Sequence, residues 1–230
     1  MNKYPIIFAI IMLLAGCSTV RDVDGNRYKT MKINGMQWMA ENLRTTHYAD
    51  GTPIAKASPD SKDAEQSLYY DRFEQSDSTK KYGLLYNWYA AVRPDDSDTS
   101  GEEQGVCPDG WHLPSTAEWD LLSKGCFAER SRMAPEMTSH YRRLIKKFMP
   151  QNHAGFSIPY EFAQRGEVSY WWSSSLLVDT VAIGRYIESF NEPCPYVCYG
   201  QLINGYSVRC VRDGTIAKSR TFVARVSRKK

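Results

Sequence analysis

The sequence predicts one domain that combines helices and strands. Three observations support this: a strand pair around Asn34-Gly35, two amphipathic helical patterns, and a late run of short apolar segments. The chain has 230 residues, 42% hydrophobic and 24% charged, which is the composition of a globular domain with one sizeable core. Its formal net charge of +3 is too weak to indicate nucleic acid or an anionic membrane face as the main partner.

The N-terminal segment predicts export and lipidation. Residues 6–13 are apolar, and Leu14-Ala15-Gly16-Cys17 resembles the cleavage site of a bacterial lipoprotein signal peptide. We expect residues 1–16 to be removed, Cys17 to be acylated and residues 17–21 to form a lipidated tether in the cell envelope. Ser18 after the cysteine favours the outer membrane. A short buried strand or helix is the alternative, because the apolar run is too short to span a membrane.

A hairpin is predicted next in the chain. Residues 27–33 and 36–39 flank Asn34-Gly35, the strongest two-residue turn signal. This register places Ile33 opposite Met36, and it places Met31 opposite Trp38. We therefore expect a half-buried hairpin with its apolar side chains on one face.

The middle of the chain alternates between polar and apolar stretches. Residues 50–81 are mostly polar, which predicts an irregular excursion, whereas residues 82–92 are apolar and aromatic, which predicts a buried strand or short helix. Residues 94–103 carry five carboxylates. Calcium binding is one interpretation, but the ligand spacing of a calcium loop is absent, so a solvated acidic loop is favoured.

A helix is predicted between Leu113 and Gly125. Ser115 is followed three residues later by Glu118, which is the spacing of a capping box, and Gly125 is a typical stop. Trp119 and Leu122 are expected to share its buried face.

A second amphipathic helix is predicted at residues 139–149, and Pro150 ends it. Its apolar positions recur at helical spacing and are Tyr141, Leu144, Ile145 and Phe148. The basic side chains on its other face are open to two interpretations, a solvated face or contact with anionic polymers and lipid headgroups, and we favour the solvated face.

The last part of the chain predicts strands. The strand-like segments are residues 156–159, 170–172, 181–190 and 206–211. In the last of these, Tyr206, Val208 and Cys210 alternate with other residues, so we expect a strand with one core face. Residues 214–230 read as a basic C-terminal tail.

Six ordered blocks resemble the Fibrobacter succinogenes major paralogous domain. The blocks are residues 28–43, 82–91, 107–121, 155–159, 170–174 and 205–213. The resemblance covers about residues 22–213. It implies an α+β domain of C-type lectin-like fold, related to the formylglycine-generating enzyme group, with two helices, a small antiparallel sheet and long irregular loops.

The cysteines predict a disulfide framework, because disulfides persist in an exported protein. The resemblance implies a bridge from Cys107 to Cys210, which would close a loop of about 100 residues. Two arrangements stay open for the rest: a local Cys194–Cys198 bridge that leaves Cys126 unpaired, or a bridge from Cys126 to one of those two. A metal site is disfavoured, since no second close cysteine pair exists. Three histidines also stand alone in the sequence, namely His112, His140 and His153.

Aromatic residues suggest a sugar-binding surface, but most of them are expected to build the core. This applies to Trp38, Trp88, Trp111, Trp119 and Trp172. His112 is expected to be a buried histidine with a hydrogen-bond partner, because no nucleophile lies at motif spacing from it.

The expected function is a non-enzymatic surface binding or adhesion module whose glycan or protein ligand meets residues 179–202. Glu188, Asn191 and Glu192 offer oxygen ligands for a calcium-bridged sugar, although Cys194 replaces the Asn that follows Glu-Pro in sugar-binding lectins. Calcium is the one cofactor considered. The membrane is the expected partner through the N-terminal lipid, and nucleic acid is not expected.

Two other functions stay open. One is a structural or assembly subunit of a surface appendage or envelope complex. The other is an enzyme of the formylglycine-generating type, whose chemistry uses a pair of thiols to hold copper. This chain would have to use Cys107 or Cys210 for such a pair.

Overall fold

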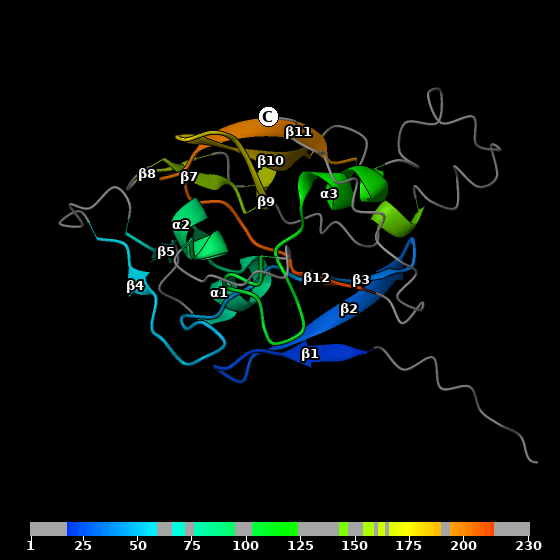
Figure 1. Cartoon of the computed structure of the whole chain (residues 1–230), viewed down its shortest axis with the longest axis horizontal. Helices are drawn as coiled ribbons and strands as arrows, with labels where there is room; N and C mark the ends of the chain where they lie inside the picture. Colours follow the sequence, from blue (N-terminus) through cyan, green and yellow to red (C-terminus); the bar gives the residue numbers. More distant parts are fainter. Residues whose placement is uncertain are drawn as a thin grey trace, which may run out of the picture.

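The fold is an α+β arrangement of several small antiparallel sheets and few short helices (Figure 1). The computed structural model describes residues 18–58, 66–71, 76–94, 103–123, 143–146, 154–158, 161–163, 166–189 and 194–213. The predictions for the signal peptide, the acidic loop at 95–102 and the basic tail at 214–230 lie outside these residues. Among the described residues, no helix is long and apolar enough to cross a membrane.

The first sheet is the hairpin sheet, with strand order β1-β2-β3-β12. Its strands are β1 (Thr19–Arg21), β2 (Arg27–Ile33), β3 (Met36–Met39) and β12 (Val211–Arg212), all antiparallel. Ile33 pairs with Met36 and Met31 pairs with Trp38, so the predicted register is confirmed. Asn34 and Gly35 both have positive φ, at 51° and 85°, as a two-residue hairpin turn of this type requires.

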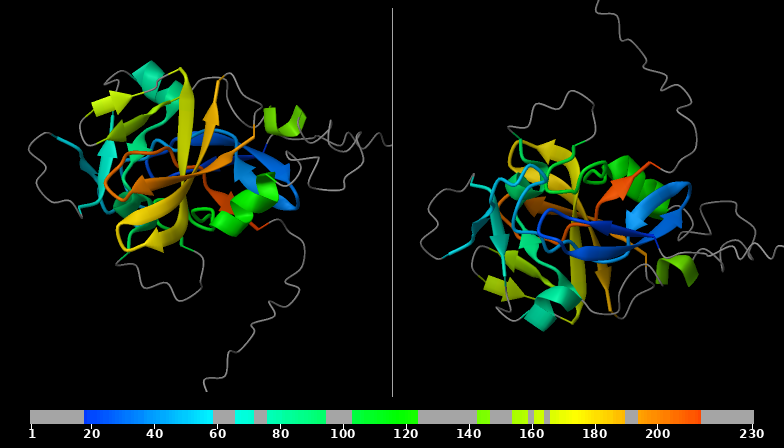
Figure 2. Two further views of the ribbon diagram at one scale, coloured as in Figure 1. Left: turned by 90° about the horizontal axis from the view of Figure 1, so that it is seen from above. Right: turned by 90° about the horizontal axis from the view of Figure 1, so that it is seen from below.

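The second sheet, the β9–β11 sheet, has the order β11-β10-β9. Its strands are β9 (Val168–Val178), β10 (Val181–Glu188) and β11 (Tyr196–Gln201). It contains the predicted strand segment at 170–172 and residues 181–188 of the one predicted at 181–190, and it lies above the hairpin sheet in Figure 1. The views from above and below show its strands running across the β2–β3 hairpin (Figure 2).

Shorter strands complete the described sheets. A parallel β4–β5 pair and an antiparallel β5–β6 pair join β4 (Ala55–Lys56), β5 (Leu68–Tyr70) and β6 (Leu85–Tyr86). The remaining pair is β7 (Phe156–Ile158) with β8 (Glu161–Ala163). The predicted excursion at 50–81 is therefore less irregular than expected, because it contributes β4, β5 and helix α1 (Ser76–Tyr82).

The other described helices are α2 (Trp88–Val92) and α3 (Thr116–Ser123). The buried stretch at 82–92 is confirmed as a strand, β6, followed directly by α2. Asn87 caps α2 by accepting a hydrogen bond from the Ala90 amide. Of the predicted helix at 139–149, only residues 143–146 are described; they are helical and bury Ile145.

Helix α3 begins with the predicted capping box. The Ser115 amide and hydroxyl both donate to Glu118 Oε2, at 2.7 and 2.8 Å, and the Glu118 amide donates back to Ser115 Oγ at 3.3 Å. Trp119 and Leu122 are buried, as the helical pattern predicted. On β10, the buried Arg185 guanidinium donates to Asp120 at 2.5 Å and thereby ties α3 to the second sheet.

Two large hydrophobic clusters fill the space between these elements. The first cluster includes Tyr28, Met39, Trp172, Tyr206 and Cys210. The second joins Ile33 and Trp38 of the hairpin to Trp119, Trp171 and Ile187. The expected apolar face of the hairpin is confirmed, because Met31, Ile33, Met36 and Trp38 all pack in or against the second cluster. The other face is buried only at Tyr28 and Met39, and Lys32 on that face is exposed. All five tryptophans expected in the core are buried.

The segment 205–212, which we call the connecting segment, does not form the strand that was expected at residues 206–211. Only Val211 and Arg212 form a strand, and every residue from Tyr206 to Val211 is buried. The segment runs between the two clusters: Tyr206, Val208 and Cys210 belong to the first, and Val211 belongs to the second. The prediction of a strand with one core face was wrong, because both sides of this segment pack against other parts of the protein.

Candidate functional site

The predicted ligand residue Glu188 lies at the end of β10, on a sheet face that carries tyrosines. Residues two apart on a strand share a face, and residues directly opposite in an antiparallel pair do so as well. Tyr186 pairs with Tyr170 of β9 and with Tyr196 of β11, and Glu188 follows Tyr186 by two positions. The three tyrosines and Glu188 therefore share one face.

The tyrosine rings form a half-exposed row together with Phe156 of β7, which we call the aromatic shelf (Phe156, Tyr170, Tyr186 and Tyr196). The ring centroids of Tyr170 and Tyr186 lie 5.8 Å apart and nearly parallel, at 22°. Those of Tyr186 and Tyr196 lie 5.7 Å apart, and those of Phe156 and Tyr170 lie 5.0 Å apart. All four rings are partly exposed.

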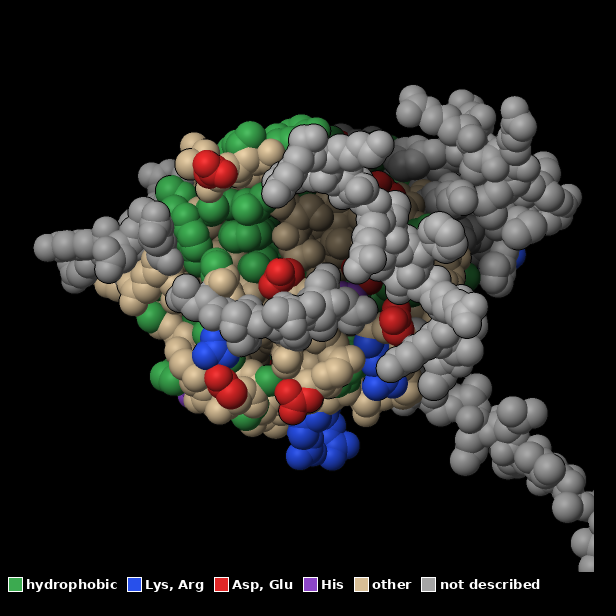
Figure 3. All heavy atoms as spheres, viewed as in Figure 1, with side chains coloured by type: hydrophobic (Ala, Val, Ile, Leu, Met, Phe, Trp, Pro, Cys, Tyr) green, Lys and Arg blue, Asp and Glu red, His purple; other side chains and the backbone are tan. Residues whose placement is uncertain are grey.

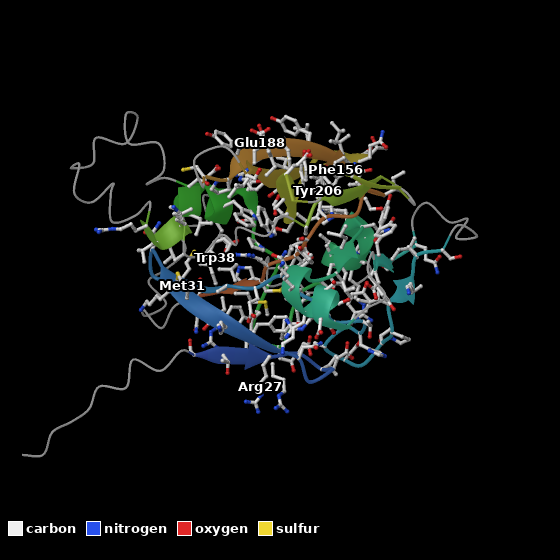
Figure 4. The ribbon with its side chains drawn as sticks, turned by 180° about the vertical axis from the view of Figure 1, so that it is seen from behind. Arg27, Met31, Trp38, Phe156, Glu188 and Tyr206 are labelled. Atoms are coloured by element: carbon white, nitrogen blue, oxygen red, sulfur yellow. A yellow bond between two sulfur atoms is a disulfide. The ribbon has the colours of Figure 1, made fainter. Side chains whose placement is uncertain are left out.

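The core holds the shelf in place from one side. Tyr206 stacks on both Trp172, at 4.1 Å, and Tyr170, at 5.1 Å, so stacked rings continue from the buried cluster to the surface. A side chain at Gly200 would come within 2.7 Å of Trp172 and Tyr206, so the glycine allows this close packing. In the rear view, Phe156 and Tyr206 lie together below Glu188 (Figure 4).

Tyr170 of the shelf stays uncharged at neutral pH. Burial raises the pKa of Tyr170, and the charges of Cys198, Tyr186 and Glu188 raise it further. Burial also raises the pKa of the Cys198 thiol to about 12, although Arg185 and the Gly184 amide act in the opposite direction. The Tyr170 phenol therefore remains a hydrogen-bond donor beside the Glu188 carboxylate.

The cysteines fall into separate surroundings. Cys107 and Cys210 form a disulfide across 103 residues of sequence, the pair that the resemblance implied. Cys198 is a free thiol, so the expected Cys194–Cys198 bridge is not formed. The reason is that Cys194 packs in the second cluster, whereas Cys198 packs against the first. Cys126 and Cys17 lie outside the described residues.

The other predicted site residues are only partly placed. Asn191 and Glu192 lie outside the described residues, as do His140 and His153, so the calcium-bridged arrangement with Glu188 stays a prediction. Within the described ranges, no group of three or more His, Cys, Asp or Glu side chains could hold a metal ion.

His112 is buried and has a partner, as expected. Its Nε2 lies 2.7 Å from Glu118 Oε1, in the carboxylate that caps α3. Burial raises the pKa of Glu118, but the hydrogen bonds from His112 and Ser115 outweigh burial and hold this pKa below its usual value. The His112–Glu118 pair links α3 to β12, because His112 and Val211 exchange two backbone hydrogen bonds: the amide of each donates to the carbonyl of the other.

A second histidine–carboxylate pair was missed in the sequence. His47 Nδ1 lies 2.6 Å from Asp24 Oδ1, and the Thr46 amide donates to Asp24 Oδ2 at 2.6 Å. The two residues are 23 positions apart and no motif relates them, so only the fold brings them together. These contacts tie the β1–β2 turn to the segment after β3.

The outward face of β11 and the tip of the β9–β10 hairpin are apolar. Five large hydrophobic side chains are exposed there, namely Leu176, Leu177, Val178, Val197 and Tyr199. Val197 and Tyr199 alternate with Tyr196 and Cys198, so they lie on the face of β11 opposite the shelf. Hydrophobic side chains gather over this region in the space-filling view (Figure 3).

The shelf was not predicted because its residues come from four separate strands, β7, β9, β10 and β11, and have no common motif. Tyr170 and Tyr186 were seen only as parts of separate predicted strands, and Tyr196 lay in the stretch at 179–202 that was expected to meet a ligand. The period of two along β10, which places Tyr186 and Glu188 on one face, was the available signal.

Comparison with known proteins agrees with the resemblance of the ordered blocks. The family model of the Fibrobacter succinogenes major domain matches residues 31–212. No curated protein and no solved structure matches the chain. The family model spans most of the chain, from the middle of β2 through β3, α3, the β9–β11 sheet and the connecting segment. The chain therefore belongs to the Fibrobacter succinogenes major domain family.

Proposed function

We propose that this protein is a lipid-anchored, non-enzymatic binding module of the cell envelope, and that the aromatic shelf binds a glycan. The observation that carries this proposal is the shelf itself: a row of half-exposed rings on a sheet, with a carboxylate on the same face. The C–H face of a pyranose packs on flat aromatic surfaces, and Glu188 is placed to accept hydroxyl hydrogen bonds.

The N-terminal sequence supports the anchor. The signal-like segment of residues 1–16 stands directly before Cys17. The tether expected at 17–21 is shorter than predicted, because Thr19–Arg21 form β1 and pair with β2. The architecture that the family resemblance implies is C-type lectin-like. It agrees with β12 pairing with β3, which places the beginning and the end of the domain in one sheet.

The arrangement of thiols favours binding over the formylglycine-generating alternative. Cys107 and Cys210 are joined to each other, and burial raises the pKa of Cys198 to about 12. Thiolate ligation requires deprotonation, which this environment opposes. Neither the bridged pair nor Cys198 is thus prepared to act as a copper thiolate.

The test is binding of a glycan panel to the full chain, by calorimetry with and without calcium. Tyr196→Ala should weaken binding of a recognised glycan about five- to tenfold, because one stacking surface is lost. Tyr199→Ala is the matched control, since Tyr199 lies on the same strand but points to the other face. Thermal melting of each variant reports whether it is folded. Absence of heat with every glycan, or a larger loss for Tyr199→Ala, would reject the proposal.

The exposed apolar side chains favour assembly as a second candidate function. Tyr199 is 62% exposed and Val178 is 55% exposed, which is unusual for a cluster of large apolar residues. Light scattering should then show oligomers of the full chain that Tyr199→Lys and Leu177→Lys convert to monomers. A wild-type monomer at all concentrations would remove this candidate.

A further inference from the structure

Two arginines face each other across the ribbon formed by β1 and β2. Arg21 pairs directly with Arg27 in the antiparallel register, and Thr19 pairs with Lys29. Arg21, Arg27 and Lys29 therefore lie on one face of the ribbon, and all three are exposed. We call these three residues the basic ribbon. Like charges directly opposite each other destabilise a strand pair, so this arrangement favours an anion between them.

The nearby carboxylates are engaged elsewhere. Asp22 is buried and accepts hydrogen bonds from the Tyr28 hydroxyl, at 2.5 Å, and from Asn26. Asp24 accepts from the Thr46 amide and lies against His47.

The remaining acid is Glu41, which accepts from the Lys29 backbone amide at 2.6 Å. Where both partners are described, the ion pairs are those of His47, Arg93, His112 and Arg185, and the basic ribbon takes part in none of these. Its three cations are available to an external anion.

The basic ribbon adjoins the predicted site of lipidation. Arg21 is four residues from Cys17 in the sequence, and a single residue, Ser18, separates Cys17 from the start of β1. In the rear view, Arg27 lies at one end of the molecule and Glu188 at the other (Figure 4). The net charge of +3 describes the whole chain and therefore gave no indication of this local group of three cations.

We propose that the basic ribbon binds anionic phospholipid headgroups at the membrane that holds the lipid anchor. This inference rests on the anchored function proposed above. The guanidinium groups of Arg21 and Arg27 offer paired N–H donors that match phosphate oxygens. Contact through the ribbon orients the domain with the aromatic shelf directed away from the membrane, where a ligand can reach it.

The test uses the full chain with Cys17→Ser, which removes the acyl acceptor, and flotation with lipid vesicles. Phosphatidylcholine vesicles measure the binding due to the apolar N-terminal segment, and vesicles that also contain phosphatidylglycerol measure the electrostatic increment. Arg21→Gln combined with Arg27→Gln should lower the ratio of the two partition coefficients roughly 10- to 30-fold. About 0.5 M salt should abolish the increment in the parent chain.

The matched control is Arg143→Gln combined with Lys146→Gln. It changes the net charge by the same amount on two exposed residues of the helical segment 143–146, which is not part of the ribbon. This pair should change the ratio by less than about twofold. An equal loss in the control, or no loss in the ribbon variant, overturns the proposal.

Acylation is read separately, by mass spectrometry of the N-terminal peptide from the chain with Cys17 intact. If Cys17 is unmodified while the electrostatic increment is intact, the lipid anchor is rejected and headgroup binding by the basic ribbon is supported. If Cys17 is acylated while the electrostatic increment is absent, headgroup binding by the basic ribbon is rejected and the lipid anchor is supported. Glycan binding by the shelf is measured without vesicles and is independent of both outcomes.

Discussion

The β2–β3 hairpin and the β9–β10 hairpin both close with two residues, yet their ladders differ. Asn34 and Gly35 take positive φ, and β2 and β3 pair without any shift in register. Asp179 and Thr180 are not among the positive-φ residues, and the β9–β10 register shifts twice next to that turn. A turn whose twist matches the strands keeps a regular ladder, whereas a mismatched turn is accommodated by bulges.

The two sheets also present different chemistry to solvent. The free end of the hairpin sheet carries Arg21, Arg27 and Lys29, while the β9–β11 sheet carries the aromatic shelf and the exposed apolar tip. The connecting segment joins them: the Met39 amide donates to the Cys210 carbonyl, and the Ser207 amide donates to the Tyr170 carbonyl. The two sheets therefore depend on one buried segment for their relative position.

The largest expected effect comes from removing the disulfide that holds the connecting segment. Cys107→Ser combined with Cys210→Ser should lower the free energy of unfolding by about 4–5 kcal/mol, because the bridge closes a long loop. Urea unfolding measures this change. Hydrogen exchange should show that the β9–β11 sheet and the hairpin sheet lose protection together. Protection lost in only one sheet would mean that the segment does not couple them.

A smaller effect is expected at the Glu118 cap, which joins α3 on the second sheet to His112 beside β12. Glu118→Gln should cost about 1–2 kcal/mol at neutral pH. Because the folded pKa of Glu118 is below its usual value of 4.5, its stabilisation is complete above that pH and is lost as the pH falls through the folded pKa.

The difference in stability between wild type and Glu118→Gln should therefore shrink on acidification below about pH 4.5. Urea unfolding at a series of pH values provides the measurement. A difference that stays constant down to strongly acidic pH would show that the ionised carboxylate is not the stabilising form.

The smallest effect tests the two turns directly. Gly35→Ala should cost about 1 kcal/mol, since a φ of 85° is strained for any residue with a Cβ. Thr180→Ala changes the second residue of the other turn, is exposed, and should stay within about 0.5 kcal/mol of wild type. Urea unfolding of both variants compares them. Equal costs would contradict the difference in turn conformation.

The sequence indicated features whose cause is local. The turn at Asn34-Gly35 set the hairpin register, and the Ser115–Glu118 spacing set the start of α3. The disulfide between Cys107 and Cys210 came from the family resemblance, since spacing alone left the pairing of the five cysteines after Cys17 open. The candidate site was anticipated only at Glu188 and as a variable stretch around it.

The sequence by itself therefore determined the family, the first hairpin and the capped helix, because each depends on neighbouring residues or on ordered blocks. Tertiary structure decided the rest. The period-two pattern of Tyr206, Val208 and Cys210 predicted one buried face, but packing between two clusters buried both. Tyr170, Tyr186 and Tyr196 form a shelf only because β9, β10 and β11 pair in one register. Contacts between distant segments leave no periodic signal in any one of them, so only the folded chain assembles the surfaces proposed to bind.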